Sequence, residues 1–280
     1  MSAMYPLFQA YSALIGLVLG SFWNVAIARW PDFRSVVTPR SQCPVCSTPI
    51  AWHDNVPLLS WLVLRGKCRH CETPIAATYP LIELLGGLLG WLLFVRVMPS
   101  GHELDAAHLA TWCVYMVLVG CVVIAAFTDV RHRIIPDEVS IYAVPLALGL
   151  VALLDLGFGV MGFPAPGWRG AFLGAAAGGG FLGSMYWGAR LITGEHALGI
   201  GDVKLITLIG AFVGPAGVLV VLLMGSIMGS VGTLAATAIL WRRVYPPFGV
   251  GLAAATLVYL LYGPELVPGL LPGLARFLPQ

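Results

Sequence analysis

Eight apolar runs set the strongest limit on how this chain can fold. Only 10% of its 280 residues are charged, whereas an ordinary soluble domain is about a quarter charged. A membrane-spanning helix needs roughly 20 apolar residues, and most of the runs approach that length. The pattern predicts an all-α membrane protein with about eight transmembrane helices. We place these helices at residues 7–28, 81–98, 110–128, 139–156, 170–192, 203–213, 218–240 and 250–263.

The sixth run is too short to cross a bilayer by itself. It ends at Val213-Gly214-Pro215, and its helical rise would be only about 17 Å. Such a helix is expected to begin within the membrane beside a polar cavity, because irregular backbone is tolerated there only where protein or water covers it.

The positions of lysine and arginine predict the orientation. If the segment after the first helix is cytoplasmic and all eight helices cross, that side receives twelve of the 15 Lys and Arg residues. The other side keeps Arg96, Arg169 and Arg276. Cytoplasmic loops carry the excess of positive charge. We therefore expect the N-terminus outside and the polar segment between the first two helices in the cytoplasm.

This polar segment, residues 29–80, contains two Cys-x-x-Cys pairs, Cys43-Pro44-Val45-Cys46 and Cys68-Arg69-His70-Cys71. Paired cysteines of this spacing suit a tetrahedral zinc site in which each pair supplies two thiolates. Disulfides are the alternative, but a reducing compartment disfavours them. His53 and His70 are alternative ligands. A small polar domain needs such a metal to fold, so we expect a structural Zn²⁺ on the four cysteines.

Two acidic residues stand at the edges of apolar runs. Asp129 follows the third run, and Asp202 ends Gly199-Ile200-Gly201-Asp202 before the sixth. Carboxylates at such positions are costly and usually functional. The predicted orientation places both at the cytoplasmic face. Two facing carboxyls can share one proton, which is the working condition of an aspartic protease, so we expect a catalytic pair.

Asn24 and Glu83 are polar residues near the cytoplasmic ends of the first and second helices. Each has a structural interpretation, because small polar side chains aid helix packing and an acid suits a helix N-terminus. The other interpretation is a role in a substrate or cofactor site that faces the cytoplasm.

Together these motifs resemble the bacterial type IV prepilin peptidases, which belong to the GxGD membrane aspartyl proteases. The resemblance runs from about residue 12 to 263 and includes Gly20-Ser21-Phe22, Asn55-Val56-Pro57-Leu58-Leu59-Ser60-Trp61 and Tyr79-Pro80-Leu81-Ile82-Glu83. The chain departs from the family pattern at Thr78, where Arg is common, and at Val250, where Pro is common. Both departures lie outside the pair of acids and concern the methyl-transfer or cytoplasmic site.

The resemblance implies a bifunctional enzyme of the bacterial inner membrane. It would cut the leader of type IV prepilins and type II secretion pseudopilins after Gly at the cytoplasmic face, and then methylate the new N-terminus with S-adenosylmethionine. Asp129 and Asp202 would be catalytic, and Cys43, Cys46, Cys68 and Cys71 would be the family's zinc ligands. No glycine-rich loop on a strand marks a cofactor site, so we name Glu83 and Asn24 as candidates to bind S-adenosylmethionine.

Other functions remain as alternatives. A peptidase without methyl transfer is the nearest, and a zinc-bearing assembly factor without enzymatic activity belongs to another class. A transporter should show internal repeats and acids near the bilayer midplane, which we do not find. No feature indicates a nucleic-acid partner or an oligomeric state. The expected parts are a first helix (1–28), a zinc domain with the four cysteines (29–80), a helix bundle (81–263) and a tail (264–280).

Overall fold

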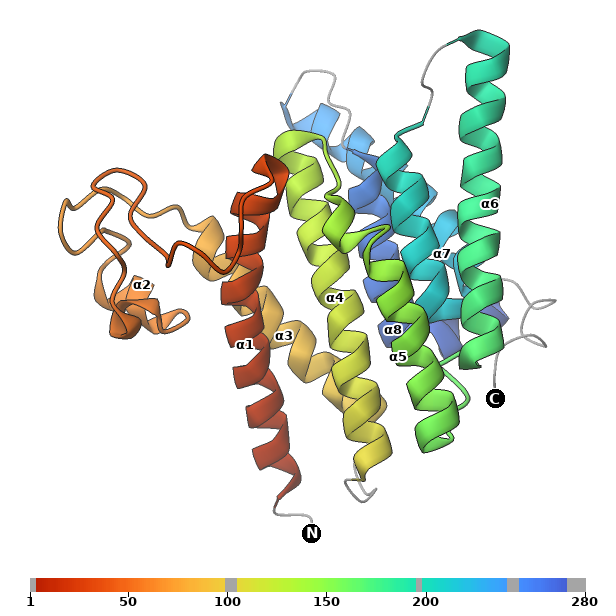
Figure 1. The fold of residues 1–280 in the computed structure, drawn as a ribbon, viewed down its shortest axis with the longest axis horizontal. Helices are drawn as coiled ribbons and strands as arrows, with labels where there is room; N and C mark the ends of the chain where they lie inside the picture. The colour runs from red at the N-terminus through yellow and green to blue at the C-terminus, as the bar shows by residue number, and fades with distance from the viewer. Residues whose placement is uncertain (1–3, 99–104, 195–197, 241–246, 271–280) are drawn as a thin grey trace. The chain divides into compact units, whose positions relative to one another are not determined.

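The computed structural model describes residues 4–98, 105–194, 198–240 and 247–270. Within these ranges the chain is helical, with isolated β-bridges but no strand (Figure 1). The long helices are α1 (Tyr5–Arg29), α3 (Thr78–Val97), α4 (Ala106–His132), α5 (Ala143–Phe158), α6 (Gly167–Thr193), α7 (Ile200–Leu240) and α8 (Phe248–Leu270). The short ones are η1 (Trp30–Asp32), η2 (Trp52–Asn55), α2 (Leu59–Val63) and η3 (Asp137–Val139).

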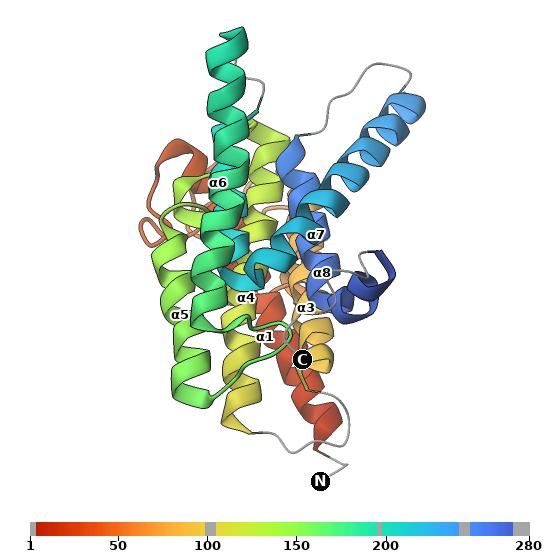
Figure 2. The same cartoon turned by 90° about the vertical axis from the view of Figure 1, so that its right-hand side faces the viewer.

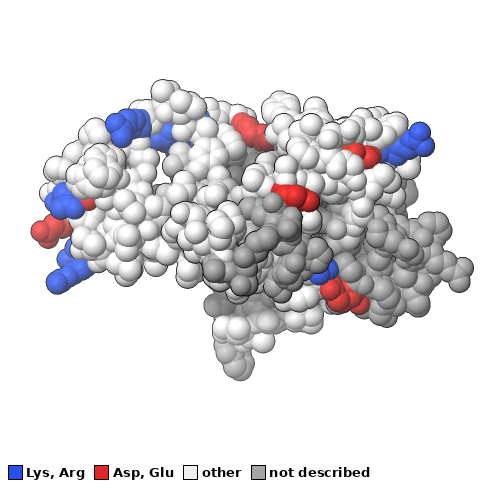
Figure 3. Space-filling view, turned by 90° about the horizontal axis from the view of Figure 1, so that it is seen from below, with Lys and Arg blue, Asp and Glu red and all other residues white. Residues whose placement is uncertain are grey.

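Five of the described helical segments are long and apolar enough to cross a membrane. They are Tyr5–Asp32, Thr78–Val97, Ala106–His132, Asp137–Phe158 and Ile200–Ile239, and a shorter apolar helix covers Phe248–Gly263. In the face shown in Figure 3, most of the described surface is neither acidic nor basic. The predicted class, an all-α membrane protein, is therefore confirmed.

The sixth and seventh predicted helices form the two halves of α7. They join at a kink where Gly214 has φ 72° and ψ 177° and Pro215 follows. Glycine adopts a positive φ without steric cost, and proline cannot donate the next helical hydrogen bond. The sequence prediction that the first half ends at this point is confirmed.

Several helix boundaries differ from the predicted ones. Helix α4 continues one turn past Asp129 and ends where Arg133 takes a left-handed conformation (φ 56°). The segment after Pro136 forms η3, and α5 begins only at Ala143. Helix α8 continues to Leu270, so the predicted tail begins too early. The rest of the predicted tail, 271–280, lies outside the described residues. Apolar content alone does not predict where a helix begins or ends when its terminal turns contain polar residues.

The chain divides into two compact units, residues 1–103 and 104–280. Helix α3 therefore belongs to the first unit with α1 and the cysteine-containing loop, whereas the sequence-based division placed it in the bundle. The second unit contains α4 to α8.

In the first unit, α1 and α3 touch through glycines. Gly16 and Gly20 on α1 face Gly86 and Gly90 on α3. A Cβ atom built on Gly20 would lie 2.7 Å from the Cα of Glu83, and one built on Gly90 would lie 2.7 Å from the Ser12 carbonyl oxygen. Glycines four residues apart let two helix backbones approach this closely in a membrane.

The second unit uses the same arrangement between α6 and α7. Gly174 on α6 abuts Gly210 of α7, and a Cβ built on Gly178 would lie 2.7 Å from the Ile206 carbonyl oxygen. The buried Tyr115 hydroxyl of α4 lies 2.8 Å from the Phe212 carbonyl oxygen, which ties α4 to α7.

We expect Gly178→Leu to destabilise the second unit by about 1–3 kcal/mol, because overpacking costs that much in a packed interior. Gly180→Leu is the matched control on the same helix, since a Cβ built there would meet nothing within 4 Å. Thermal unfolding of the detergent-purified variants measures the difference. Equal midpoints for the two variants would contradict the packing described here.

Candidate active site and metal centre

The C-terminal end of α4 and the start of α7 lie at the same end of the second unit (Figures 1 and 2). Asp129 lies in the last turns of α4, and Asp202 lies in the first turn of α7. Both side chains are buried, with residues 6% and 8% exposed. The Asp129 carboxylate is among the groups that interact electrostatically with Asp202. The structure thus brings together two predicted acids that are far apart in the sequence and lie on different helices.

Three glycines make this approach possible. A Cβ built on Gly249 would lie 2.5 Å from Asp129 Oδ2, and one built on Gly199 would lie 3.0 Å from Asp202 Oδ2. Gly201 faces Ile135, whose Cβ would be 3.1 Å from a Cβ at that position. Any side chain at these glycines would displace a carboxylate or the segment beside it. This explains both glycines of the Gly-x-Gly-Asp motif in physical terms.

The two carboxylates have different surroundings. The backbone N–H of Gly249 donates a hydrogen bond to Asp129. Asp202 Oδ1 is buried and has no hydrogen-bond partner within the described ranges. A buried polar atom without a partner costs free energy and calls for an explanation. A site that takes up a water or a substrate carbonyl beside Asp202 provides one.

An ion pair fixes the first turn of α7. Lys204 Nζ lies 2.6 Å from Asp137 Oδ1 in η3, which follows Ile135 in the segment that packs on Gly201. Lys204 therefore anchors the segment between α4 and η3 beside the two acids. From the sequence alone, Lys204 is one of the twelve Lys and Arg residues on the predicted cytoplasmic side. Its place as a cation two residues after Asp202, within an apolar helix, was the available signal.

The four predicted metal ligands also come together. The sulfur atoms of Cys43, Cys46, Cys68 and Cys71 all lie within 4.8 Å of one another. The Sγ–Sγ distances are 3.7 Å for Cys43–Cys71 and 4.0 Å for Cys46–Cys68. A tetrahedral zinc site with Zn–S bonds near 2.3 Å requires sulfur atoms about 3.8 Å apart. The two sulfur pairs at 3.7 and 4.0 Å match this spacing, so the cluster could hold one Zn²⁺.

The two cysteine pairs are structural repeats, which the sequence analysis missed. The sequences Cys43-Pro44-Val45-Cys46-Ser47-Thr48-Pro49-Ile50 and Cys68-Arg69-His70-Cys71-Glu72-Thr73-Pro74-Ile75 end in the same Thr-Pro-Ile. The N–H of Ser47 donates to the Cys43 carbonyl at 2.9 Å, and that of Glu72 donates to the Cys68 carbonyl at 3.0 Å. Both turn residues have positive φ. The shared Thr-Pro-Ile was the signal available in the sequence.

Each repeat places a threonine hydroxyl against its second cysteine. Thr48 Oγ1 is 3.3 Å from Cys46 Sγ, and Thr73 Oγ1 is 3.2 Å from Cys71 Sγ. The hydrogen bond between Thr73 and Cys71 lowers the pKa of Cys71 to about 6, and the one between Thr48 and Cys46 lowers the pKa of Cys46. Thiolates are the form that binds a metal, so the threonines favour metal binding.

Asn24 and Glu83, the two cofactor candidates, contact the backbone of the first unit. Asn24 Nδ2 donates to the carbonyl oxygens of Tyr79 at 3.0 Å and Gly20 at 3.2 Å, which joins α1 to the start of α3. Glu83 Oε2 accepts from the N–H of Leu58 at 2.9 Å, where Leu58 has a positive φ of 60°. Both side chains thus hold the two ends of the loop and the start of α2 in place.

We expect Glu83→Gln to preserve the loop, because an amide oxygen still accepts from Leu58. Glu83→Leu should destabilise the first unit by about 1–3 kcal/mol, the cost of a polar group left without its partner. Zinc content and limited proteolysis of the two purified variants measure this difference. Equal loss of the loop in both variants would show that the charge of Glu83, and not its hydrogen bond, is required.

The comparisons with known proteins divide the chain near the boundary between the two units. The family model "Bacterial Peptidase A24 N-terminal domain" matches residues 14–97, and the model "Type IV leader peptidase family" matches residues 116–234. Asp129 and Asp202 fall in the second match, and the four cysteines fall in the first.

Curated relatives agree with these matches. A prepilin leader peptidase/N-methyltransferase of Myxococcus xanthus is 41% identical over 226 residues, which cover 81% of this chain and 62% of the relative. Proteins of the same name from Aeromonas hydrophila and Xanthomonas campestris are 36% and 34% identical, over 90% and 93% of both chains. No solved structure matches the chain significantly. With its apolar helices, the chain is an inner-membrane protein, and it belongs to the type IV leader peptidase family.

Proposed function

We propose that this protein cuts the leader peptide from prepilins and pseudopilins after Gly and then methylates the new N-terminal amine with S-adenosylmethionine. The observation that carries the peptidase part is the pair of buried acids, Asp129 and Asp202, in the region that matches the leader peptidase family. The names of the relatives, prepilin leader peptidase/N-methyltransferase, support both activities.

Cleavage proceeds by general acid–base catalysis. A water molecule held between the two carboxyls attacks the carbonyl carbon of the leader Gly. One carboxylate removes a proton from the water, while the protonated partner donates a hydrogen bond to the carbonyl oxygen. The C–N bond then breaks, and the leaving amine takes a proton from the pair. The N–H of Gly249 keeps Asp129 oriented during these steps.

Methyl transfer requires the new N-terminal amine in its neutral form. Its lone pair attacks the methyl carbon of S-adenosylmethionine, the C–S bond breaks with its electrons on sulfur, and the amine then loses a proton. We assign this reaction to the first unit, which contains the cofactor candidates Glu83 and Asn24. Their hydrogen bonds with Leu58 and Tyr79 suit a role in which Glu83 and Asn24 position the loop.

Zinc supports this unit structurally. Cys43, Cys46, Cys68 and Cys71 would hold one Zn²⁺, which would cross-link the two repeats when bound. The excess of Lys and Arg on one side supports a cytoplasmic location for this loop and the acids, with the N-terminus outside.

The test is mass spectrometry of a prepilin-like peptide incubated with the detergent-purified protein, with and without S-adenosylmethionine. We expect a cut after Gly in both samples, and a single added methyl group only with the co-substrate. A cut without methylation would reduce the proposal to a peptidase. No cut by a folded, zinc-loaded protein would overturn it.

A further inference from the structure

The first unit contains a cavity of about 300 Å³ at the end of α1, where the loop folds back beside it. This volume lies at the lower end of the range for small-molecule sites, which runs from about 300 to 1,000 Å³. Its lining includes Phe22, Arg29, Arg40, Ser41, Trp52 and Asn55. None of them has been given a role in either reaction above.

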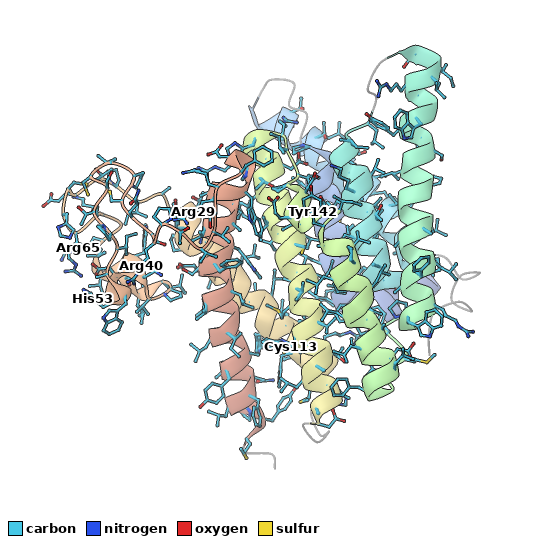
Figure 4. The ribbon with its side chains drawn as sticks, viewed as in Figure 1. Arg29, Arg40, His53, Arg65, Cys113 and Tyr142 are labelled. Atoms are coloured by element: carbon cyan, nitrogen blue, oxygen red, sulfur yellow. The ribbon has the colours of Figure 1, made fainter. Side chains whose placement is uncertain are left out.

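The charged residues of this cavity suit an anionic group. Arg29 and Arg40 line it, and none of the described lining residues is acidic. Figure 4 labels both, Arg29 at the end of α1 and Arg40 in the loop. Arg29 Nη1 donates to the Ser35 carbonyl oxygen at 2.9 Å, whereas Arg40 makes no hydrogen bond or ion pair with any other described residue. A guanidinium in this state can bind a carboxylate through two hydrogen bonds.

The aromatic residues suit a planar base and a cation. Trp52 is 76% exposed and Phe22 is 44% exposed. Exposed aromatic faces stack on nucleic-acid bases, and they also attract cations that lie over the ring. Asn55 carries both donors and an acceptor, which match the edge of an adenine ring.

The wall that carries Trp52 and Asn55 is fixed to the metal domain. Asp54 lies between them in η2 and accepts from Arg69, with 2.7 Å between Arg69 Nε and Asp54 Oδ2. This contact holds the pKa of Asp54 below its ordinary value. Because Arg69 belongs to the second cysteine repeat, the metal domain sets the position of the wall.

We propose that this cavity binds S-adenosylmethionine, with its carboxylate on Arg29 and Arg40 and its adenine against Trp52 and Asn55. The co-substrate combines a carboxylate, an aromatic base, a sulfonium cation and an ammonium group, and the cavity offers a partner for the first three. The second unit uses its buried acids for cleavage, and the first unit matches a separate family model. The inference rests on the proposed function and adds the residues that bind the methyl donor.

The test compares binding in matched pairs of full-length variants. Arg40→Gln and Trp52→Leu alter the cavity, whereas Arg34→Gln and Phe33→Leu alter neighbouring residues that are exposed and do not line it. Radiolabelled S-adenosylmethionine is titrated against each protein, and its KM is measured in the methylation assay. We expect the dissociation constant and KM to rise at least about tenfold in the first pair, as loss of one charge-assisted hydrogen bond implies. We expect no change in the second pair.

Peptide cleavage and zinc content are measured on the same samples to separate the two proposals. Normal cleavage and zinc, with weaker binding only in the cavity variants, supports the cavity. Unchanged binding in both cavity variants overturns it and leaves the proposed cleavage intact. Cofactor binding that depends on Arg40 in a protein that neither cleaves nor methylates would support the cavity and overturn the proposed function.

A second readout does not depend on activity. Ultraviolet cross-linking of radiolabelled S-adenosylmethionine to the wild-type protein should label peptides from residues 22–55. Label confined to residues 104–280 would overturn the proposal. Retention of phosphatidylglycerol that depends on Arg40, with unchanged S-adenosylmethionine binding, would also overturn it and identify a lipid phosphate as the occupant.

Discussion

Asp129→Asn and Asp202→Asn should each reduce prepilin cleavage by about 10²–10⁴-fold, the contribution that a positioned acid or base makes to a reaction. An amide can neither remove the proton from water nor supply one to the leaving amine. The double variant should cleave almost as fast as the slower of the two single variants, because residues that act as a unit have non-additive effects. Single-turnover cleavage of a prepilin peptide measures all three.

Folding should survive these changes. Asparagine has almost the shape of aspartate, and an amide oxygen at position 129 can still accept from the N–H of Gly249. Asp155→Asn is the matched control, because Asp155 accepts from the N–H of Trp168 in the second unit and takes no part in the pair. Cleavage by either purified single variant at near the wild-type rate would remove that acid from the mechanism.

Replacing Cys71 by Ser should release the metal and unfold the loop of the first unit. Structural zinc sites contribute about 10–16 kcal/mol of apparent binding free energy, which small metal domains use to fold. Metal analysis should give one Zn²⁺ per chain for the wild type and almost none for the variant. Limited proteolysis should cut the variant between the two cysteine pairs. Methylation should be lost with the loop, because η2 is hydrogen-bonded to Arg69.

Cys113→Ser is the control for this experiment. Cys113 lies in α4, and its sulfur is not part of the cluster of four. This variant should keep both its zinc and its resistance to protease. A Cys71→Ser protein with full zinc content would contradict the four-sulfur site.

Much of the architecture could be predicted, because apolar runs and cysteine spacing are local signals. The break in α7 at Gly214 and the all-helical membrane class both followed from such signals. The pairing of α1 with α3 did not, because several helices carry glycines four residues apart and nothing local says which of them meet. The sequence-based division groups α3 with the later helices, whereas the contacts group it with α1.

The two acids of the candidate site could be predicted from the sequence, but the residues that hold them in place could not. A carboxylate beside an apolar run is conspicuous, whereas the partners of Asp129 and Lys204 lie far along the chain, at Gly249 and Asp137. Contacts of this kind depend on how helices pack, which the residues on either side do not reveal. The cysteine repeat, in contrast, is a local signal, because both cysteine pairs are followed by the same Thr-Pro-Ile in the sequence.

The glycine contact between α1 and α3 has a consequence for the loop between them. Closing a free segment of about 50 residues costs about 3.5 kcal/mol of chain entropy before any other contact forms. The two helices meet through Gly16 and Gly86, and Asn24 joins α1 to Tyr79, so their association closes this ring in advance. The metal then has only to order a segment whose ends already meet. A bulky side chain at Gly16 would therefore weaken zinc binding, although its nearest neighbours are Gly86 and Gly87 and not the cysteines.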